Sequence, residues 1–165
     1  MIYSSVIKTD RLDIRNIEEA DAEQIVAWRN DPDVNKYLGI PKELTVGEHL
    51  EWYRNSYLNN ENRLDCIAVL SGSDAVVGVF GVKRESAEAT AAEVSYLLDK
   101  NYQGKGYASE AVKALIGFAK EEWGCREFIA TIHRSNSRSA GFIKGLGFEK
   151  IDSENGMDIF RKNFL

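Results

Sequence analysis

The feature that most constrains the fold is a strand, a glycine loop, a helix and a second strand that follow one another without interruption. Residues 93–98 (EVSYLL) have the composition of a half-buried strand, and Gly104 and Gly106 stand in the loop that follows. Apolar residues then recur at helical spacing from Ala108 to Trp123, and residues 127–133 indicate the next strand. This order predicts a crossover unit with two parallel strands in an α/β sheet.

The segments around this unit predict further strands and helices. Residues 66–70 and 76–82 are expected to form an antiparallel hairpin, and a second hairpin is expected around Asn155-Gly156. Asp21 is expected to cap a first helix, and Thr45 with Glu48 to form a capping box for a second. With a strand at 12–15 and a short helix at 137–146, we expect an α/β fold. Its mixed central sheet has about six or seven strands and about four flanking helices.

Length and charge limit the class of protein. A chain of 165 residues that is 44% hydrophobic suits one domain, residues 1–165. The net charge of −5 argues against a nucleic-acid partner, and no apolar stretch approaches the ~20 residues that cross a membrane. Because the N-terminus also lacks a signal-peptide pattern, we expect a cytoplasmic location. Cys66 and Cys125 show no metal-ligand spacing, so both are expected to be buried thiols and no metal is expected.

The loop at Gln103–Ala108 carries the chemistry of the crossover unit. A loop that opens a helix presents unpaired N–H groups at the positive end of the helix dipole, which favours phosphate oxygens. The dinucleotide-binding pattern G-x-G-x-x-G fails because Ser109 stands at the third glycine, and the P-loop pattern fails on spacing. A glycine turn that only caps the helix is the alternative.

Two motifs in this order resemble the GNAT acetyltransferase superfamily. The run from Glu93 to Ala111 resembles its coenzyme motif Q/R-x-x-G-x-G/A, and Asn136 with Ser139 and Gly147-Phe148 resembles its second motif. The resemblance spans nearly the whole chain and implies a GNAT fold that transfers an acetyl group from acetyl-CoA to a primary amine, by direct attack in a ternary complex. It implies as coenzyme-binding residues Tyr96, Leu98, Gln103, Gly104, Lys105, Gly106, Tyr107, Ala108, Asn136 and Ser139.

Two residues are candidates for proton transfer. Glu93, on the strand that enters the loop, is the candidate base for the amine, and a strand carboxylate facing solvent or an arginine is the alternative. Many members of the superfamily have a tyrosine acid where this chain has Ile143. Ser139, which resembles the serine of ribosomal-protein N-terminal acetyltransferases, is therefore the candidate donor to the sulfur, unless it only begins the helix.

The acceptor site is expected at the first two helices and the loop between them, at residues Trp28, Arg29, Asn30, Tyr37, Trp52 and Tyr53. This stretch resembles nucleotide-linked amino-sugar N-acetyltransferases, in which Arg29 and Arg54 would meet a phosphate. It is also similar to ribosomal-protein N-terminal acetyltransferases, so the acceptor is either a small molecule or a peptide amine. Trp28 and Trp52 have packing as an alternative role. His49 is expected to face solvent, with a position toward the acceptor as the alternative. His133 is expected to be a polar strand end, with a general base as the alternative.

The missing tyrosine at Ile143 leaves a non-enzymatic alternative, in which the fold binds acetyl-CoA as a sensor or scaffold. An edge strand of the closing hairpin permits either a monomer or a homodimer.

Overall fold

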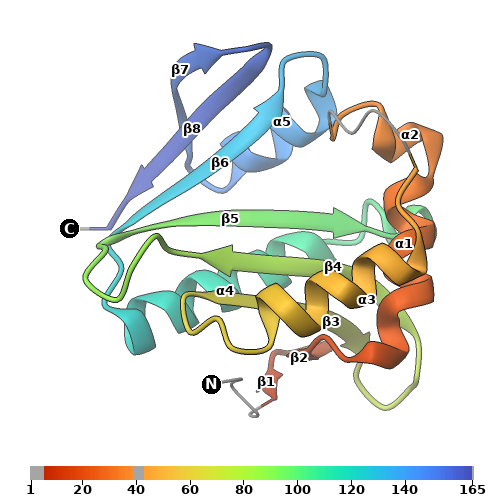
Figure 1. Cartoon of the computed structure of the whole chain (residues 1–165). Coiled ribbons are helices and arrows are strands. Elements are labelled where there is room, and N and C mark those ends of the chain that lie inside the picture. The colour runs from red at the N-terminus through yellow and green to blue at the C-terminus, as the bar shows by residue number, and fades with distance from the viewer. Residues whose placement is uncertain (1–5, 39–42, 165) are drawn as a thin grey trace.

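One eight-stranded sheet, in the order β1-β2-β3-β4-β5-β6-β8-β7, organises the part of the chain that the computed structural model describes, residues 6–38 and 43–164 (Figure 1). The strands are β1 (Ile7–Lys8), β2 (Leu12–Asn16), β3 (Arg63–Leu70), β4 (Val76–Lys83), β5 (Ala91–Leu98), β6 (Glu127–His133), β7 (Glu149–Glu154) and β8 (Met157–Asn163). The α-helices are α1 (Ala22–Asn30), α2 (Pro32–Asn35), α3 (Val46–Trp52), α4 (Tyr107–Trp123) and α5 (Ser137–Gly145). Shorter helical turns are η1 (Glu19–Asp21), the π-helical η2 (Tyr53–Tyr57) and η3 (Lys100–Tyr102).

The expected α/β class and crossover unit are confirmed, but the expected element counts were low. The described residues form eight strands and five α-helices, whereas about six or seven strands and about four helices were expected. The additional strand is the two-residue β1, which pairs with β2. The additional helix is α2, because Asp31 accepts a hydrogen bond from the Asp33 amide (2.9 Å) and Pro32 suits a first helical position.

The capping predictions have mixed outcomes. The capping box of α3 is present, with Thr45 Oγ1 3.1 Å from the Glu48 amide and Glu48 Oε2 3.0 Å from the Thr45 amide. Asp21 precedes α1, but its side chain does not cap that helix. Its carboxylate instead accepts hydrogen bonds from the Arg15 guanidinium and from the Glu18 amide (2.7 Å). The expectation of an Asp21 cap was therefore wrong, because a nearer guanidinium engages both oxygens.

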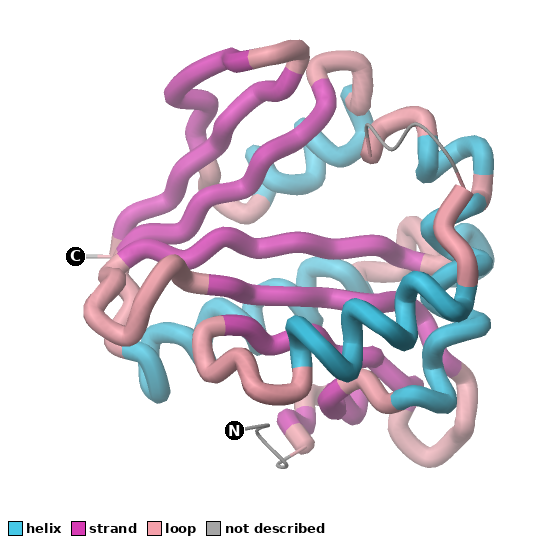
Figure 2. Tube along the Cα trace, in the orientation of Figure 1, coloured by secondary structure: helices cyan, strands magenta, loops and turns pink. Residues whose placement is uncertain are grey.

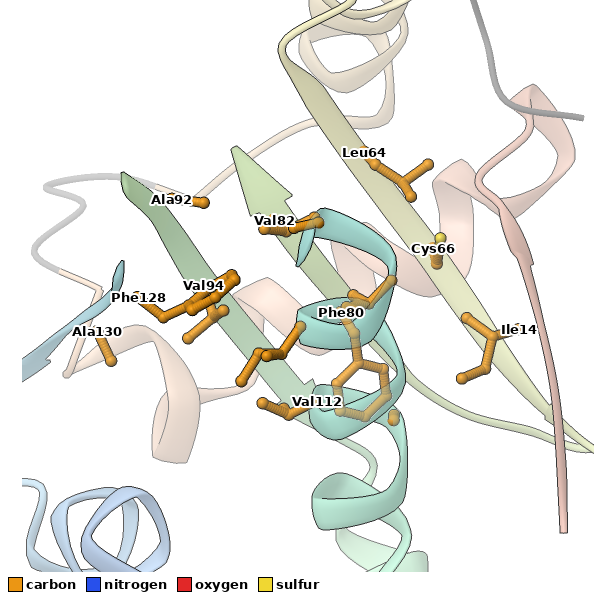
Figure 3. Packing of buried hydrophobic residues seen from close by; sticks show 14 of the residues in the cluster. Ile14, Leu64, Cys66, Phe80, Val82, Ala92, Val94, Val112, Phe128 and Ala130 are labelled. Carbon is orange, nitrogen blue, oxygen red and sulfur yellow. The ribbon is translucent and has the colours of Figure 1, made fainter. Parts of the chain in front are cut away.

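Helices cover the two faces of the sheet unequally. Helix α4 packs on one face against a core that includes Phe80, Val94 and Phe128, seen close by in Figure 3. Helices α1 and α3 and the turn η2 cover part of the opposite face through a second cluster that includes Ile25, Trp28, Tyr53, Tyr57 and Ile67. Cys66 and Cys125 are buried free thiols, as expected. No helix in the described part of the chain is long and apolar enough to span a membrane.

Strands β5 and β6 form a fork. They are parallel, as predicted, but they pair only at Ala91–Glu127, Ala92–Phe128 and Glu93–Ile129. Beyond Glu93 the two strands separate, and Figure 2 shows their C-terminal halves diverging. Strand β6 continues to pair with β8 along its full length, from Glu127–Asn163 to His133–Met157. The fork thus leaves the second half of β5 without a β6 partner, next to the glycine loop.

Candidate active site

The glycine loop begins α4 with two residues in a left-handed conformation. Gly104 has φ of 77° and Gly106, at the N-cap of α4, has φ of 84°. A Cβ at Gly106 would lie 3.2 Å from Nη2 of Arg11, whereas the space at Gly104 is open. Glycine is therefore required at both positions for backbone conformation, and at Gly106 for space as well. The first-turn amides that follow have no acceptor within the helix and are available to an anion.

Arg11, just before β2, holds this loop in place. Its Nη1 donates to the Lys105 carbonyl (2.8 Å), its Nε donates to Glu110 Oε1 (2.9 Å), and its guanidinium lies 4.4 Å from the centre of the Tyr107 ring. Glu110 also accepts hydrogen bonds from Thr9 Oγ1 and from the Arg11 amide. Burial acts to raise the pKa of Glu110, but these hydrogen bonds outweigh it and lower the pKa. Sequence reasoning missed the Arg11–Glu110 pair because 99 positions separate its members.

A second contact joins the loop to α1. The indole Nε1 of Trp28 donates to Asp99 Oδ2 (2.9 Å), and Oδ1 of Asp99 accepts from the Asn101 amide (2.8 Å) at the start of η3. Trp28 itself is 7% exposed and belongs to the cluster beneath the helices. Trp28 therefore packs under the helices, as the alternative role had it, and its hydrogen bond joins α1 to the turn before the glycine loop.

Tyr96 and Ser139 meet across the open part of the fork. The hydroxyl oxygens of Tyr96 on β5 and Ser139 on α5 are 2.7 Å apart, and the Tyr96 ring packs 4.8 Å from that of Phe142. Burial raises the pKa of Tyr96 to about 12, although the Ser139 hydrogen bond acts the other way. Oδ1 of Asn136 accepts from the Ser139 amide (3.2 Å) and caps α5. The fold thus brings Tyr96, Asn136 and Ser139 together at the open part of the fork.

Ile143 is fully buried in the core below α5. This part of the helix therefore presents no hydroxyl to the fork. The Tyr96 and Ser139 hydroxyls are the polar groups that the two arms of the fork bring into contact. The contact of the Tyr96 hydroxyl with Ser139 had no local signal in the sequence, because the motif indicated only the Tyr96 backbone.

Glu93 is the last residue of β5 that pairs with β6. Its side chain is half-buried, and its Oε2 lies 3.9 Å from Nζ of Lys83 on β4. Because successive strand residues point to opposite faces, Glu93 and Tyr96 lie on opposite faces of β5. Glu93 therefore stands where the strands separate, on the face that α1 and α3 partly cover.

Five of the six residues expected at the acceptor site divide into two groups. Tyr53 is buried and donates to the Ile17 carbonyl (3.4 Å), and Asn30 exchanges two hydrogen bonds with the Leu44 backbone (2.7 and 2.8 Å). These two, like Trp28, support the helices. Tyr37 packs 5.8 Å from the His133 ring at the end of β6, and Trp52 lies half-buried.

Charged side chains lie beneath these helices. Nε of Arg63 donates to Oδ2 of buried Asp65 (2.9 Å), and the Arg63 guanidinium lies 4.9 Å from the centre of the Trp52 ring. Burial raises the pKa of Asp65 and lowers that of Arg29, each against the attraction between the two charges. Arg54, in contrast, is exposed and paired with Glu19 at 2.7 and 2.9 Å.

The expectation that His49 faces solvent was wrong. Its side chain lies under α3 with 5% of the residue exposed, 5.4 Å from the Trp52 ring. Burial and the nearby Arg29 charge lower the pKa of His49, while Asp21 acts in the opposite direction. His133 is partly exposed at the end of β6, and its Nδ1 accepts from the Ser135 amide (3.1 Å). Within residues 6–38 and 43–164, no three metal-ligating side chains gather into one site.

The chain matches the model of a known protein family. A model of the acetyltransferase (GNAT) domain matches residues 11–149, so the chain belongs to the GNAT family and is an acyltransferase. A Bacillus licheniformis protein, the uncharacterized N-acetyltransferase p20, is 30% identical over 146 residues, which cover 86% of this chain and 81% of that protein.

Solved structures share the fold at lower identity. A nucleotide-linked sugar GNAT, FdhC in its apo form, superposes with a TM-score of 0.82 at 19% identity, covering 98% of this chain and 91% of that one. The ribosomal L7/L12 alpha-N-protein acetyltransferase RimL, in complex with coenzyme A, gives 0.76 at 16% identity, covering 97% and 98%. At these identities the likeness concerns the fold alone.

Proposed function

We propose that this chain is an acetyl-CoA-dependent N-acetyltransferase that acts on a primary amine by direct attack in a ternary complex. The observation that carries the proposal is the fork between β5 and β6, which opens beside a glycine loop at the N-terminus of α4. The fork leaves strand backbone for the pantetheine arm at Tyr96 and Leu98. The loop, from Gln103 to Ala108, offers amides to the pyrophosphate.

Coenzyme binding follows from these positions. The α4 dipole and the Lys105 side chain favour the pyrophosphate charge, and the Arg11 contacts stabilise the loop conformation. Asn136 uses its side-chain oxygen to cap α5, which leaves its amide hydrogens to donate to the pantetheine near the thioester. CoA in the RimL complex supports this choice of coenzyme.

Acetyl transfer then needs a neutral amine, a polarised thioester and a proton for the departing thiolate. We assign the first proton to Glu93, which removes it from the amine directly or through water. The amine attacks the thioester carbon, the C–S bond breaks, and the nitrogen releases its remaining extra proton to water. The sulfur receives a proton from Ser139, which Tyr96 orients and which takes a proton back from water. Placement of the two substrates supplies most of the acceleration.

The acceptor is a protein N-terminus or a nucleotide-linked amino sugar. FdhC and RimL, which share the fold, are a nucleotide-linked sugar enzyme and a protein N-terminal enzyme by their names. On this chain, Arg29, Tyr37 and Trp52 are partly exposed candidates for contact with the acceptor.

The test is release of free CoA from acetyl-CoA in the presence of UDP-linked amino sugars, N-terminal peptides, polyamines and aminoglycosides. We expect thiol release that depends on one class of amine, together with an acetylated product of the correct mass. Saturable acetyl-CoA binding without acceptor-dependent release would contradict the proposal and support a sensor.

A further inference from the structure

The peptide group between Lys105 and Gly106 lies in the middle of the glycine loop, where the backbone alone does little to fix its orientation. Gly104 and Gly106 flank Lys105, with φ of 77° and 84°. Because glycine adopts positive and negative φ about equally readily, a peptide group next to it can turn over at low cost. The Gly106 amide donates no hydrogen bond to any group within residues 6–38 and 43–164. Some other contact must therefore set the direction of this amide.

Arg11 contacts the carbonyl side of the same peptide group. Its Nη1 donates to the Lys105 carbonyl (2.8 Å). A trans peptide bond directs its C=O and its N–H to opposite sides, so this hydrogen bond turns the Gly106 amide away from Arg11. Nη2 of Arg11 lies 3.2 Å from the position of a Cβ on Gly106, so the guanidinium also occupies the space on its own side of the loop.

The position of Arg11 is itself fixed by α4. Glu110, in the first turn of that helix, accepts from Arg11 Nε through Oε1 (2.9 Å) and from the Arg11 amide through Oε2 (2.9 Å). Oε2 also accepts from Thr9 Oγ1, and the guanidinium lies 4.4 Å from the centre of the Tyr107 ring. Hydrogen bonds to an ionised group are stronger than those between neutral groups. One carboxylate thus fixes both the side chain and the backbone of Arg11 relative to the loop.

We infer that Arg11 is a positioning residue for the coenzyme, which orients the Lys105–Gly106 peptide before binding so that the Gly106 amide already faces the diphosphate. This inference rests on the proposed coenzyme site and deepens it. An amide that is oriented in advance spares the coenzyme the cost of turning it over on binding. The guanidinium on the carbonyl also polarises the peptide group, which strengthens the N–H on the other side as a donor.

The test combines calorimetric titration with CoA and the ¹H–¹⁵N NMR signal of Gly106 in the free protein. The proteins are wild type, Arg11→Gln, Arg11→Lys, the double variant Arg11→Gln with Glu110→Gln, and the control Arg161→Gln. Arg161 matches Arg11 because its side chain is 43% exposed, against 44% for Arg11, and it also lies beside a glutamate, Glu127.

We expect Arg11→Gln to raise Kd for CoA about 10-fold, because a charge-assisted contact that orients the amide is lost. In the free variant, the Gly106 signal should broaden through exchange between two peptide orientations, while that of Gly124, the left-handed C-cap of α4, should not change. Arg11→Lys should bind CoA as weakly as Arg11→Gln, because an ammonium lacks the planar fork that reaches both the loop carbonyl and Glu110. Arg161→Gln should behave as wild type in both measurements.

The double variant separates orientation from charge. Arg11→Gln also leaves the Glu110 carboxylate without its cation close to the diphosphate. If repulsion by that carboxylate is the whole effect, Glu110→Gln restores the affinity for CoA, and the inference is overturned. An unchanged Kd in Arg11→Gln, or a Gly106 signal as sharp as in wild type, overturns it as well. We expect the double variant to remain weak and the signal to remain broad.

Thermal unfolding shows whether each variant is folded. If Arg11→Gln is not, Arg11→Lys, which keeps a cation beside Glu110, decides the question by the same two measurements. Wild type that does not bind CoA would refute the proposed coenzyme site, and this inference with it. Wild type that binds CoA, with Arg11 variants that bind it equally well, would refute only the role of Arg11.

Discussion

At the scale of single residues, successive side chains of β5 point to opposite faces of the sheet. This places the two groups that we propose for proton transfer on opposite sides of the strand. Glu93 points to the face of α1 and α3, while Tyr96 points toward α5 and meets Ser139 at 2.7 Å. In the proposed mechanism, an amine that approaches from the helical side would reach Glu93 first, and the sulfur would lie on the side of the two hydroxyls. The fork permits this because β6 does not pair with β5 beyond Glu93.

We expect Glu93→Gln to lower kcat about 10²-fold, because a bound ammonium must lose its proton before it attacks. The deficit should shrink as the pH rises, since a free amine then deprotonates without help. The measurement is kcat against pH with saturating acetyl-CoA and acceptor. Glu127→Gln, which removes an ion-paired carboxylate at the start of β6, is the matched control. Equal turnover in Glu93→Gln and wild type would remove Glu93 from the mechanism.

The hydroxyl pair gives a second prediction. Ser139→Ala should lower kcat about 10²-fold with KM for acetyl-CoA nearly unchanged, because a proton donor to the sulfur is lost. Tyr96→Phe keeps the ring packing against Phe142 and removes only the hydroxyl that orients Ser139. Its effect should be smaller, and the double variant should match Ser139→Ala alone. Additive losses measured by single-turnover kinetics would show instead that Tyr96 acts independently.

At the scale of elements, local signals predicted the secondary structure well and the long-range contacts poorly. Three predicted local features are present: the capping box at Thr45, the glycine loop that begins α4, and the Asn155-Gly156 turn. Each of them depends on a few consecutive residues. The contacts of Arg11 with Glu110 and of Trp28 with Asp99 join distant segments, so no short pattern indicates them. The burial of His49 was not predicted, because which face of α3 is buried depends on the segments that pack against the helix and not on the helix sequence alone.

Gly106, at the N-cap of α4, and Gly117, within the helix, allow a matched test of the glycine loop. Gly106→Ala forces a side chain into a left-handed conformation beside Arg11, at a cost of about 1–2 kcal/mol, and should raise Kd for CoA about 10-fold. Gly117→Ala meets no atom within 4 Å inside the same helix, so it should stabilise the protein by about 0.5–1 kcal/mol and leave CoA affinity unchanged. Calorimetry for CoA and thermal unfolding measure the two effects. Unchanged CoA affinity in Gly106→Ala would contradict the role of the loop.

At the scale of the whole molecule, net charge and local charge disagree. The chain carries a net charge of −5, yet the covered sheet face holds Arg29, Arg63 and Asp65 together with a neutral histidine. Composition could exclude a nucleic-acid partner as an expectation, but it could not reveal this cluster, because residues 29, 49, 63 and 65 meet only after the sheet and helices form. Residues near the proposed acceptor site therefore come together only through tertiary packing, whereas the proposed coenzyme loop was indicated by one motif of consecutive residues.

The buried histidine links this packing to the pH dependence of stability. Because burial lowers the pKa of His49 in the folded state, the unfolded chain binds a proton there first as the pH falls below about 6.5. His49 should therefore reduce the free energy of unfolding as the pH decreases, with a slope that approaches about 1.4 kcal/mol per pH unit. Asp65, whose pKa burial raises, acts in the opposite direction, but it is present in wild type and variant alike.

The measurement is urea unfolding of wild type and His49→Gln between pH 7.5 and 5.5. Replacing a buried side chain also changes the absolute stability, so the quantity compared is the difference between the two slopes. We expect the free energy of unfolding of His49→Gln to fall less steeply below about pH 6.5, and the two curves to run parallel above pH 7. Parallel curves over the whole range would mean that the imidazole is as accessible to protons in the folded protein as in the unfolded chain.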